Sequence, residues 1–135
     1  MEATTLLFPM PGVAYICMQQ AYNTDDDLEG LKCVVQSVYD RSYLTHERFV
    51  FVFNAEGVNY VQPRLLSRFA NWLGTKREEN EKYLICSNMI FEKPFIEKCF
   101  KIIVSIFKPV KPVYIHRNVA EANSALEAQL KPELK

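Results

Sequence analysis

The chain has 135 residues, of which 49% are hydrophobic, and its 16 basic and 16 acidic side chains cancel. A chain of this length is expected to form one domain that buries roughly two thirds of its unfolded surface. Zero net charge argues against a dedicated nucleic-acid binder held by phosphate contacts. The charge is unevenly spread: residues 1–47 carry two basic and seven acidic side chains, net −5, whereas residues 92–118 carry six basic and two acidic ones, net +4. We therefore expect an acidic side and a basic side.

The cysteines and the apolar runs indicate the compartment. Cys17, Cys33, Cys86 and Cys99 are scattered without a closely spaced pair, which is typical of free thiols in a reducing compartment. The N-terminal segment lacks the pattern of a signal peptide, and no apolar run approaches the ~18–20 residues needed to span a bilayer. We expect a cytoplasmic, soluble protein, with attachment to a membrane surface as the alternative.

The first third of the chain predicts a hairpin and a helix. Two β-prone runs, residues 4–8 and 13–18, flank a turn signal at Pro11 and Gly12, which predicts an antiparallel pair of strands. The aspartates at 25–27 precede apolar residues at helical spacing, and carboxylates in a first turn interact favourably with the helix dipole. A metal site is disfavoured because no second carboxylate cluster accompanies them. Gly30 indicates either close packing or a later helix start.

At the centre of the chain the apolar period changes from that of a strand to that of a helix. Residues 49–53 form an unbroken apolar run, and a polar loop at 54–62 separates it from apolar residues at helical spacing between Leu65 and Leu73. Pro63 suits a first helical turn, and Gly74 suits a left-handed residue at the end of the helix. In an α/β sheet, such a strand-to-helix loop is where ligands and partners bind.

The last third alternates strand and helix signals. The charged residues 75–82 predict a surface loop or frayed helix end. Apolar runs at 83–86, ending in Ser87 and Asn88, and at 112–115 predict strands. Helices follow at 95–108 and after Asn118, which forms a capping box with Glu121.

We predict an α/β fold with a mixed, mostly parallel sheet of about five strands and four helices. One domain would cover residues 1–131, with a frayed tail at 132–135. Residues expected in buried strands are Phe51, Phe53, Leu84, Val113 and Ile115.

Residues 54–66 resemble, position by position, the Asp-Leu-Ser-Gly-Val-x-Phe-Ile-Asp-Ser-Ser-Gly-Leu signature of STAS domains, the anti-sigma-factor-antagonist fold. Residues 111–115 and 121–126 are also similar to the last strand and helix of that family. The resemblance implies a regulatory, non-catalytic protein-interaction domain. Gln62, Pro63 and Arg64 occupy the Asp-Ser-Ser positions, so the serine that accepts phosphate in phospho-regulated members is missing. Phosphorylation is therefore not expected to switch this domain.

Residues 83–107 are also similar to the equivalent part of CRAL-TRIO lipid-transfer domains. Those domains are longer and carry a gate helix that this sequence lacks. The similarity implies a small lipid- or ligand-binding domain as the alternative function. That alternative requires a cavity between the sheet and the helix at 95–107.

The residues that most often perform catalysis are sparse. His46 and His116 fall at the ends of predicted elements, and neither lies close in sequence to a partner in a known nucleophile arrangement. The four glycines are isolated, so there is no phosphate-binding loop, and no metal-ligand spacing is present. We expect no enzymatic activity, no cofactor and no metal.

The helix at 95–108 is apolar over more of its surface than one sheet face requires. Its polar residues occupy roughly 100° of the helical wheel and its apolar residues about 200°. The excess predicts either internal packing or a contact with a partner, a second copy or a lipid surface. Phe95, Ile102 and Ile106 are the interface candidates on one flank, and Phe100 and Val104 lie on the other.

These observations predict a STAS-like interaction module that binds a protein partner or forms a homodimer. A lipid or membrane surface is the alternative partner. The residues expected to contact the partner or ligand are Asn54, Glu56, Gly57, Asn59, Gln62, Arg64, Ser87 and Asn88.

Overall fold

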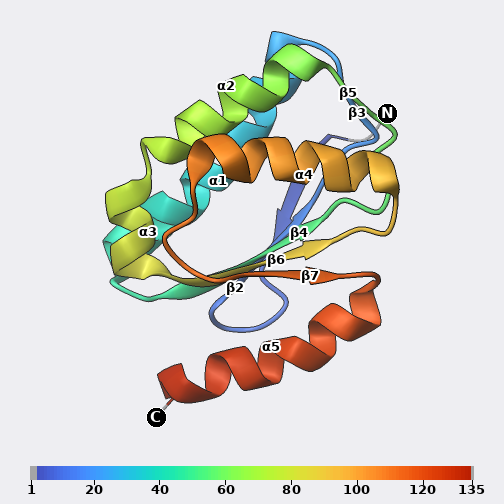
Figure 1. Cartoon of the computed structure of the whole chain (residues 1–135). Coiled ribbons are helices and arrows are strands. Elements are labelled where there is room, and N and C mark those ends of the chain that lie inside the picture. The colour runs from blue at the N-terminus through green and yellow to red at the C-terminus, as the bar shows by residue number, and fades with distance from the viewer. Residues whose placement is uncertain (1–2, 135) are drawn as a thin grey trace.

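Five of the seven described strands form one mixed sheet in the order β1-β2-β4-β6-β7, as the computed structural model shows (Figure 1). The structure describes the backbone of residues 3–134 and the side chains of residues 3–130. β1 runs antiparallel to β2, and the other neighbours are parallel, so the predicted fold class is confirmed. A separate pair, β3 and β5, was not predicted. The bounds are β1 Thr5–Leu7, β2 Val13–Cys17, β3 Ala21–Tyr22, β4 Phe49–Asn54, β5 Tyr60–Val61, β6 Leu84–Ile90 and β7 Val113–His116.

The described residues form five helices, one more than predicted. In Figure 1, α1, α2 and α4 cover one face of the sheet, and α5 covers the other alone. The sheet therefore has a core on each face, the larger beneath α1, α2 and α4 and the smaller beneath α5. The bounds are α1 Asp25–Thr45, α2 Pro63–Gly74, α3 Arg77–Tyr83, α4 Pro94–Phe107 and α5 Val119–Leu134. α5 thus includes residues 132–134 of the expected tail, and Lys135 lies outside the described residues.

Capping side chains define the starts of α1 and α5. Thr24 Oγ1 accepts from the Asp27 backbone N–H at 3.2 Å, and Asp27 Oδ2 accepts from the Thr24 N–H at 3.0 Å. At α5, Asn118 Oδ1 accepts from the Glu121 N–H at 2.9 Å. These side chains satisfy backbone donors that the first helical turn leaves without partners.

Two predictions about glycine were wrong. Gly74 is the last residue of α2 but does not have a left-handed backbone, and neither does Thr75, which caps the end of the helix with φ −74°. The reason is that the chain continues almost at once into α3, which was expected to be a loop or frayed end. Gly30 has open space where a side chain would stand, and α1 begins five residues earlier, so neither expectation for it holds.

The central strand β4 is buried on both faces, as its unbroken apolar run predicts. Phe49, Phe51 and Phe53 belong to the larger core, and Val50 and Val52 to the smaller one. β6 extends four residues beyond the predicted run, to Ile90.

The prediction that Val113 and Ile115 are buried was wrong. Both lie in β7, which is the last strand of the sheet and has a neighbour on one side only. Val113 is half-buried, and Ile115 is 52% exposed. An apolar run in the sequence does not distinguish a central strand from an edge strand.

Candidate functional site

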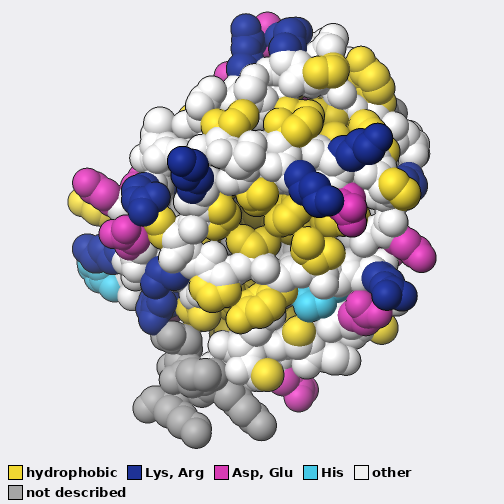
Figure 2. Space-filling model, viewed as in Figure 1, with side chains coloured by type: hydrophobic (Ala, Val, Ile, Leu, Met, Phe, Trp, Pro, Cys, Tyr) yellow, Lys and Arg dark blue, Asp and Glu magenta, His cyan; other side chains and the backbone are white. Residues whose placement is uncertain are grey.

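A cavity of about 130 Å³ lies in the larger core, between α4 and the sheet, and residues of α1 and α2 also line it. Phe53 and Met89 line it from the strands, and Phe100, Ile103 and Phe107 line it from α4. The cavity opens to the surface, and Figure 2 shows apolar side chains gathered in a hollow between α4 and β7. We call this cavity and its opening the α4 hollow.

The α4 hollow exists because α4 does not close over the edge of the sheet. Ile96 and Cys99 are the buried residues of α4, whereas Phe100, Ile103, Val104 and Phe107 remain half-buried although they face the core side. β7 is short, so it offers little surface for these side chains to cover. The wide apolar arc of α4 was the sequence signal for this site, although it did not show that the arc lines a cavity.

Among the described residues, those that line the α4 hollow include no charged side chain. Ser87 and Tyr22 are among the few residues of the lining that have a polar group on their side chain. The Tyr22 hydroxyl is already engaged, because it lies 2.7 Å from Thr4 Oγ1 and accepts from the Gln19 N–H at 3.1 Å. Burial raises the pKa of the Tyr22 hydroxyl and of the Cys99 thiol, so both stay protonated at neutral pH. Such a wall can bind apolar groups but does not supply a general base or thiolate.

Basic residues surround the opening. Lys101 lies on α4, Lys108 follows it directly, and Lys111 lies between α4 and β7. Figure 2 shows Lys and Arg side chains around the hollow. Lys101 Nζ is 3.4 Å from Glu97 Oε1, so part of this charge is balanced within the helix.

Hydrogen bonds within the predicted binding loop after β4, and with Tyr15 and Lys93 outside it, hold the loop in place. Asn54 Nδ2 donates to the Tyr15 hydroxyl at 2.9 Å, and Asn54 Oδ1 accepts from the Glu56 N–H at 3.0 Å. Lys93 Nζ donates to Asn59 Oδ1 at 3.0 Å and to the Val58 carbonyl at 3.2 Å. Glu56 and Gly57 are exposed at the tip. The contacts of Asn54 and Asn59 therefore shape the loop.

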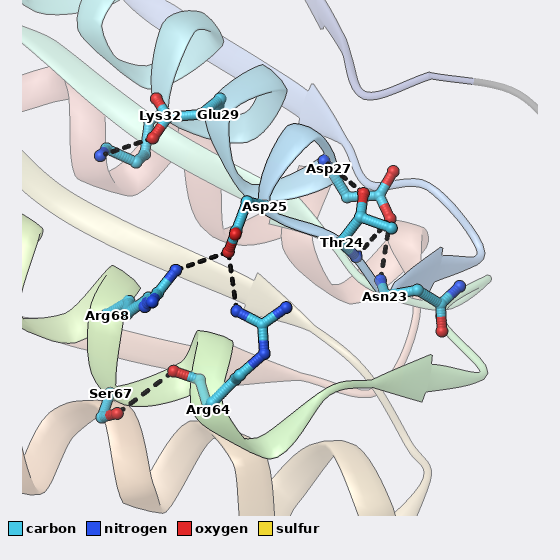
Figure 3. Close-up of polar contacts among 9 residues, drawn as sticks. All are labelled: Asn23, Thr24, Asp25, Asp27, Glu29, Lys32, Arg64, Ser67 and Arg68. Carbon is cyan, nitrogen blue, oxygen red and sulfur yellow. Dashed lines mark hydrogen bonds and ion pairs between the residues drawn. The ribbon is translucent and has the colours of Figure 1, made fainter.

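Arg64 participates in an ion pair that joins the starts of α1 and α2 (Figure 3). Its Nη1 is 2.7 Å from Asp25 Oδ1, and Arg68 Nη1 is 2.5 Å from the same oxygen. The hydrogen bond from Arg64, followed by the charges of both guanidinium groups, holds the pKa of Asp25 below its usual value. Gln62 donates its backbone N–H to the Tyr22 carbonyl at 2.8 Å. Ser67, one turn further along α2, donates to the Arg64 carbonyl at 3.3 Å.

Ser87 and Asn88 do not act at one site, because successive residues of a strand point to opposite faces. Ser87 lines the α4 hollow. Asn88 is fully buried on the other face, where its Nδ2 donates to Gln129 Oε1 at 2.8 Å and its Oδ1 lies 2.8 Å from His116 Nε2. The oxygen can only accept, so this contact places the proton on His116 Nε2. The sequence reasoning missed this network because its members are far apart in the chain.

The interface candidates on α4 are exposed. Phe95, Ile102 and Ile106 show 37%, 44% and 38% of their surface to solvent. On the opposite flank, Phe100 and Val104 are half-buried and line the hollow. The first flank is thus the one that a partner could cover without displacing core residues.

No protein-family model matches this chain, and no curated protein matches it at a significant level. Over the described part of the chain, none of the helices combines the length and apolar character needed to cross a bilayer. Within the same residues, no three His, Cys, Asp or Glu side chains are grouped so that they could hold a metal ion.

Proposed function

We propose that the domain binds a small apolar ligand, or the apolar end of a larger one, in the α4 hollow. The observation that carries the proposal is the cavity itself, which lies between the sheet and α4 and opens at the surface. The similarity of residues 83–107 to CRAL-TRIO domains implies a ligand site between the same two elements. No catalytic step is included.

The size and chemistry of the hollow define the ligand. An engineered protein cavity of about 150 Å³ lined by Leu, Ile and Phe stays dry and binds benzene. A cavity of about 130 Å³ with a similar lining therefore holds a ring or the end of an acyl chain rather than a whole lipid. The remainder of a longer ligand would lie in the opening, where the nearby lysines suit an acidic head group.

A fluorescent polyene fatty acid tests the proposal by titration. We expect saturable binding with one molecule per chain. Ser87→Leu should weaken it at least about tenfold, because the larger side chain enters the hollow and displaces the probe. Ser124→Leu is the matched control, since Ser124 is exposed on α5, on the other face of the sheet.

Val104→Phe provides a second way to fill the hollow, from α4 instead of β6. Circular dichroism should show that the variants used are folded. If the wild-type chain does not bind the probe, or if both filling variants bind it as well as Ser124→Leu does, the proposal is wrong. Native mass spectrometry of the purified chain checks independently for a co-purified lipid.

A non-catalytic interaction module is the second candidate function. The exposed flank formed by Phe95, Ile102 and Ile106 supports it, because large apolar side chains grouped on one side of a helix often mark a protein contact. The partner would be another protein or a second copy of the chain. The missing hydroxyl at residues 62–64 supports a module that is not switched by phosphorylation at the start of α2.

A further inference from the structure

The outer edge of β7 presents backbone groups that no described strand pairs. The Ser87 N–H donates to the Pro112 carbonyl at 3.0 Å, and the Phe91 N–H donates to the His116 carbonyl at 2.9 Å. Ser87 is aligned with Val113 in the parallel register. Because alternate residues of a parallel strand bond to the same neighbour, Tyr114 also faces β6. The N–H and C=O groups of Val113 and Ile115 therefore point away from the sheet.

Apart from its short length, β7 lacks the devices that usually prevent edge strands from pairing. Edge strands are commonly protected by proline, charge, a bulge or a covering element. β7 contains Val113, Tyr114, Ile115 and His116, with no proline and no Lys, Arg, Asp or Glu. Tyr114 and Ile115 are exposed. In Figure 1, α4 and α5 lie on either side of β7, and neither lies across its edge.

The charges near β7 favour an acidic partner. Lys108 and Lys111 precede the strand, and Arg117 follows it directly. Glu97 pairs with Lys101 on α4, whereas Glu121, whose Oε1 accepts from the Arg117 N–H at 3.0 Å, and Glu92, which follows Phe91, lie near the Arg117 end of β7. Lys108 and Lys111 therefore make the start of the strand positively charged.

The same charges disfavour pairing with a second copy of the chain. An antiparallel pair centred on Tyr114 would align Val113 with Ile115 of the other copy, so that the outward groups bond to each other. That register also places Lys111 opposite Arg117 at both ends of the pair. Like charges directly opposite one another destabilise a strand pair.

We propose that β7 binds an extended acidic peptide, which adds a sixth strand to the sheet between α4 and α5. Addition of a peptide strand to a free edge is a common mode of recognition, in which backbone bonds give affinity and alternate side chains give specificity. Val113 lines the α4 hollow, so alternate side chains of the peptide lie over its opening. A fitting peptide has apolar residues at its centre and Asp or Glu where it passes Lys108 and Lys111. The inference does not rest on ligand binding in the hollow.

Fluorescence anisotropy with a labelled peptide of sequence Asp-Glu-Val-Leu-Val-Glu-Asp tests the proposal. We expect saturable binding that weakens at least about tenfold when the backbone nitrogens of one alternating set of residues are methylated, and little when the other set is methylated. Methylation removes N–H donors without altering the protein. Equal binding by both methylated peptides, or no saturable binding of the parent peptide, overturns the proposal.

Protein variants locate the site. Lys111→Glu with Arg117→Glu should weaken binding at least about tenfold, whereas Arg77→Glu with Lys82→Glu on α3 makes the same change in net charge and should not. Ile115→Pro removes an outward N–H and should also weaken binding, since proline is tolerated at a free edge. The inference is wrong if the peptide still binds both the Lys111→Glu, Arg117→Glu variant and the Ile115→Pro variant. It is also wrong if the protein binds phosphatidylserine vesicles but not the peptide. Ser87→Leu should still bind the peptide, which separates this result from the fatty-acid test.

Discussion

The side chains of Asn88 and Gln129 hold each other through two hydrogen bonds. Asn88 Nδ2 donates to Gln129 Oε1, and Gln129 Nε2 donates to Asn88 Oδ1, both at 2.8 Å. The pair joins β6 to α5 beside the apolar residues of the smaller core. Asn88 Nδ2 also reaches the Phe51 carbonyl at 3.3 Å. A buried amide needs such partners, so this pair sets the position of α5 on the sheet.

Gln129→Leu should destabilise the protein by about 1–3 kcal/mol, because it removes two partners of a fully buried amide. The free energy of unfolding in urea measures the effect. Asn123→Leu is the control: Asn123 is exposed on the same helix, so the change should stay within about 0.5 kcal/mol. Combining Gln129→Leu with Asn88→Leu should recover part of the loss. If Gln129→Leu is as stable as Asn123→Leu, the Asn88–Gln129 pair does not stabilise the fold.

Tyr39→Phe should cost about 1–3 kcal/mol of stability, because it leaves the buried amide of Asn80 without its hydroxyl partner. The Tyr39 hydroxyl donates to Asn80 Oδ1 at 2.6 Å, and Tyr39 is 2% exposed. Tyr43→Phe makes the same change on the same helix at a residue that is 70% exposed. Thermal unfolding of both variants should show a clear drop for Tyr39→Phe only, and similar midpoints would refute the role of the bond.

Asp27→Ala should lower stability by about 1 kcal/mol at neutral pH, which is the typical loss when a helix cap is removed. Backbone N–H groups of Asn23 and Thr24, with a further bond from Gln19, hold the pKa of Asp27 below its ordinary value of 3.8. The folded carboxyl releases its proton more readily than the unfolded one. The charged Asp27 carboxylate therefore contributes its full stabilisation above pH 3.8, the pKa of the unfolded chain. This stabilisation is lost as the pH falls through the lower pKa of the folded protein.

Urea midpoints for wild type and Asp27→Ala, measured from neutral pH down to about pH 2, test this dependence. The difference between them should shrink in acid, since wild type then loses the charge that accepts these bonds. Asp26→Ala is the control, because the capping bonds at this turn are made by Thr24 and Asp27. A difference that is constant over the range contradicts the prediction.

Ile102→Lys should leave the melting temperature nearly unchanged and lower the oligomeric mass of the chain. Ile102 is 44% exposed, so a charge there does not enter the core. A symmetric dimer of standard size that covered this flank would bury ~800 Å² per partner. Size exclusion with native mass spectrometry measures the mass, and Ser105→Lys on the polar side of α4 is the control. A wild-type chain that is already monomeric, or an unchanged mass in the variant, refutes the interface.

Local sequence patterns predicted the elements that depend on neighbouring residues. Asn118 and Glu121 meet across a single turn, so their capping box could be identified before the structure. Phe49, Phe51 and Phe53 lie within one strand, and their run was long enough to indicate burial on both faces. Gly74 was misassigned because its backbone conformation depends on the direction of the next element. The chain begins α3 after only two residues, so no left-handed turn is needed.

The sequence by itself determined the alternation of strands and helices, the mixed and mostly parallel sheet, and the excess apolar surface of α4, because each follows from periodicity and caps along the chain. Only the tertiary structure decided that this surface lines a cavity, that Ser87 and Asn88 serve opposite faces, and that Ile115 lies on an open edge. The order of the strands in the sheet places Ile115 at the edge. It depends on contacts between residues that are distant in sequence, such as Asn88 and Gln129, which no local pattern records.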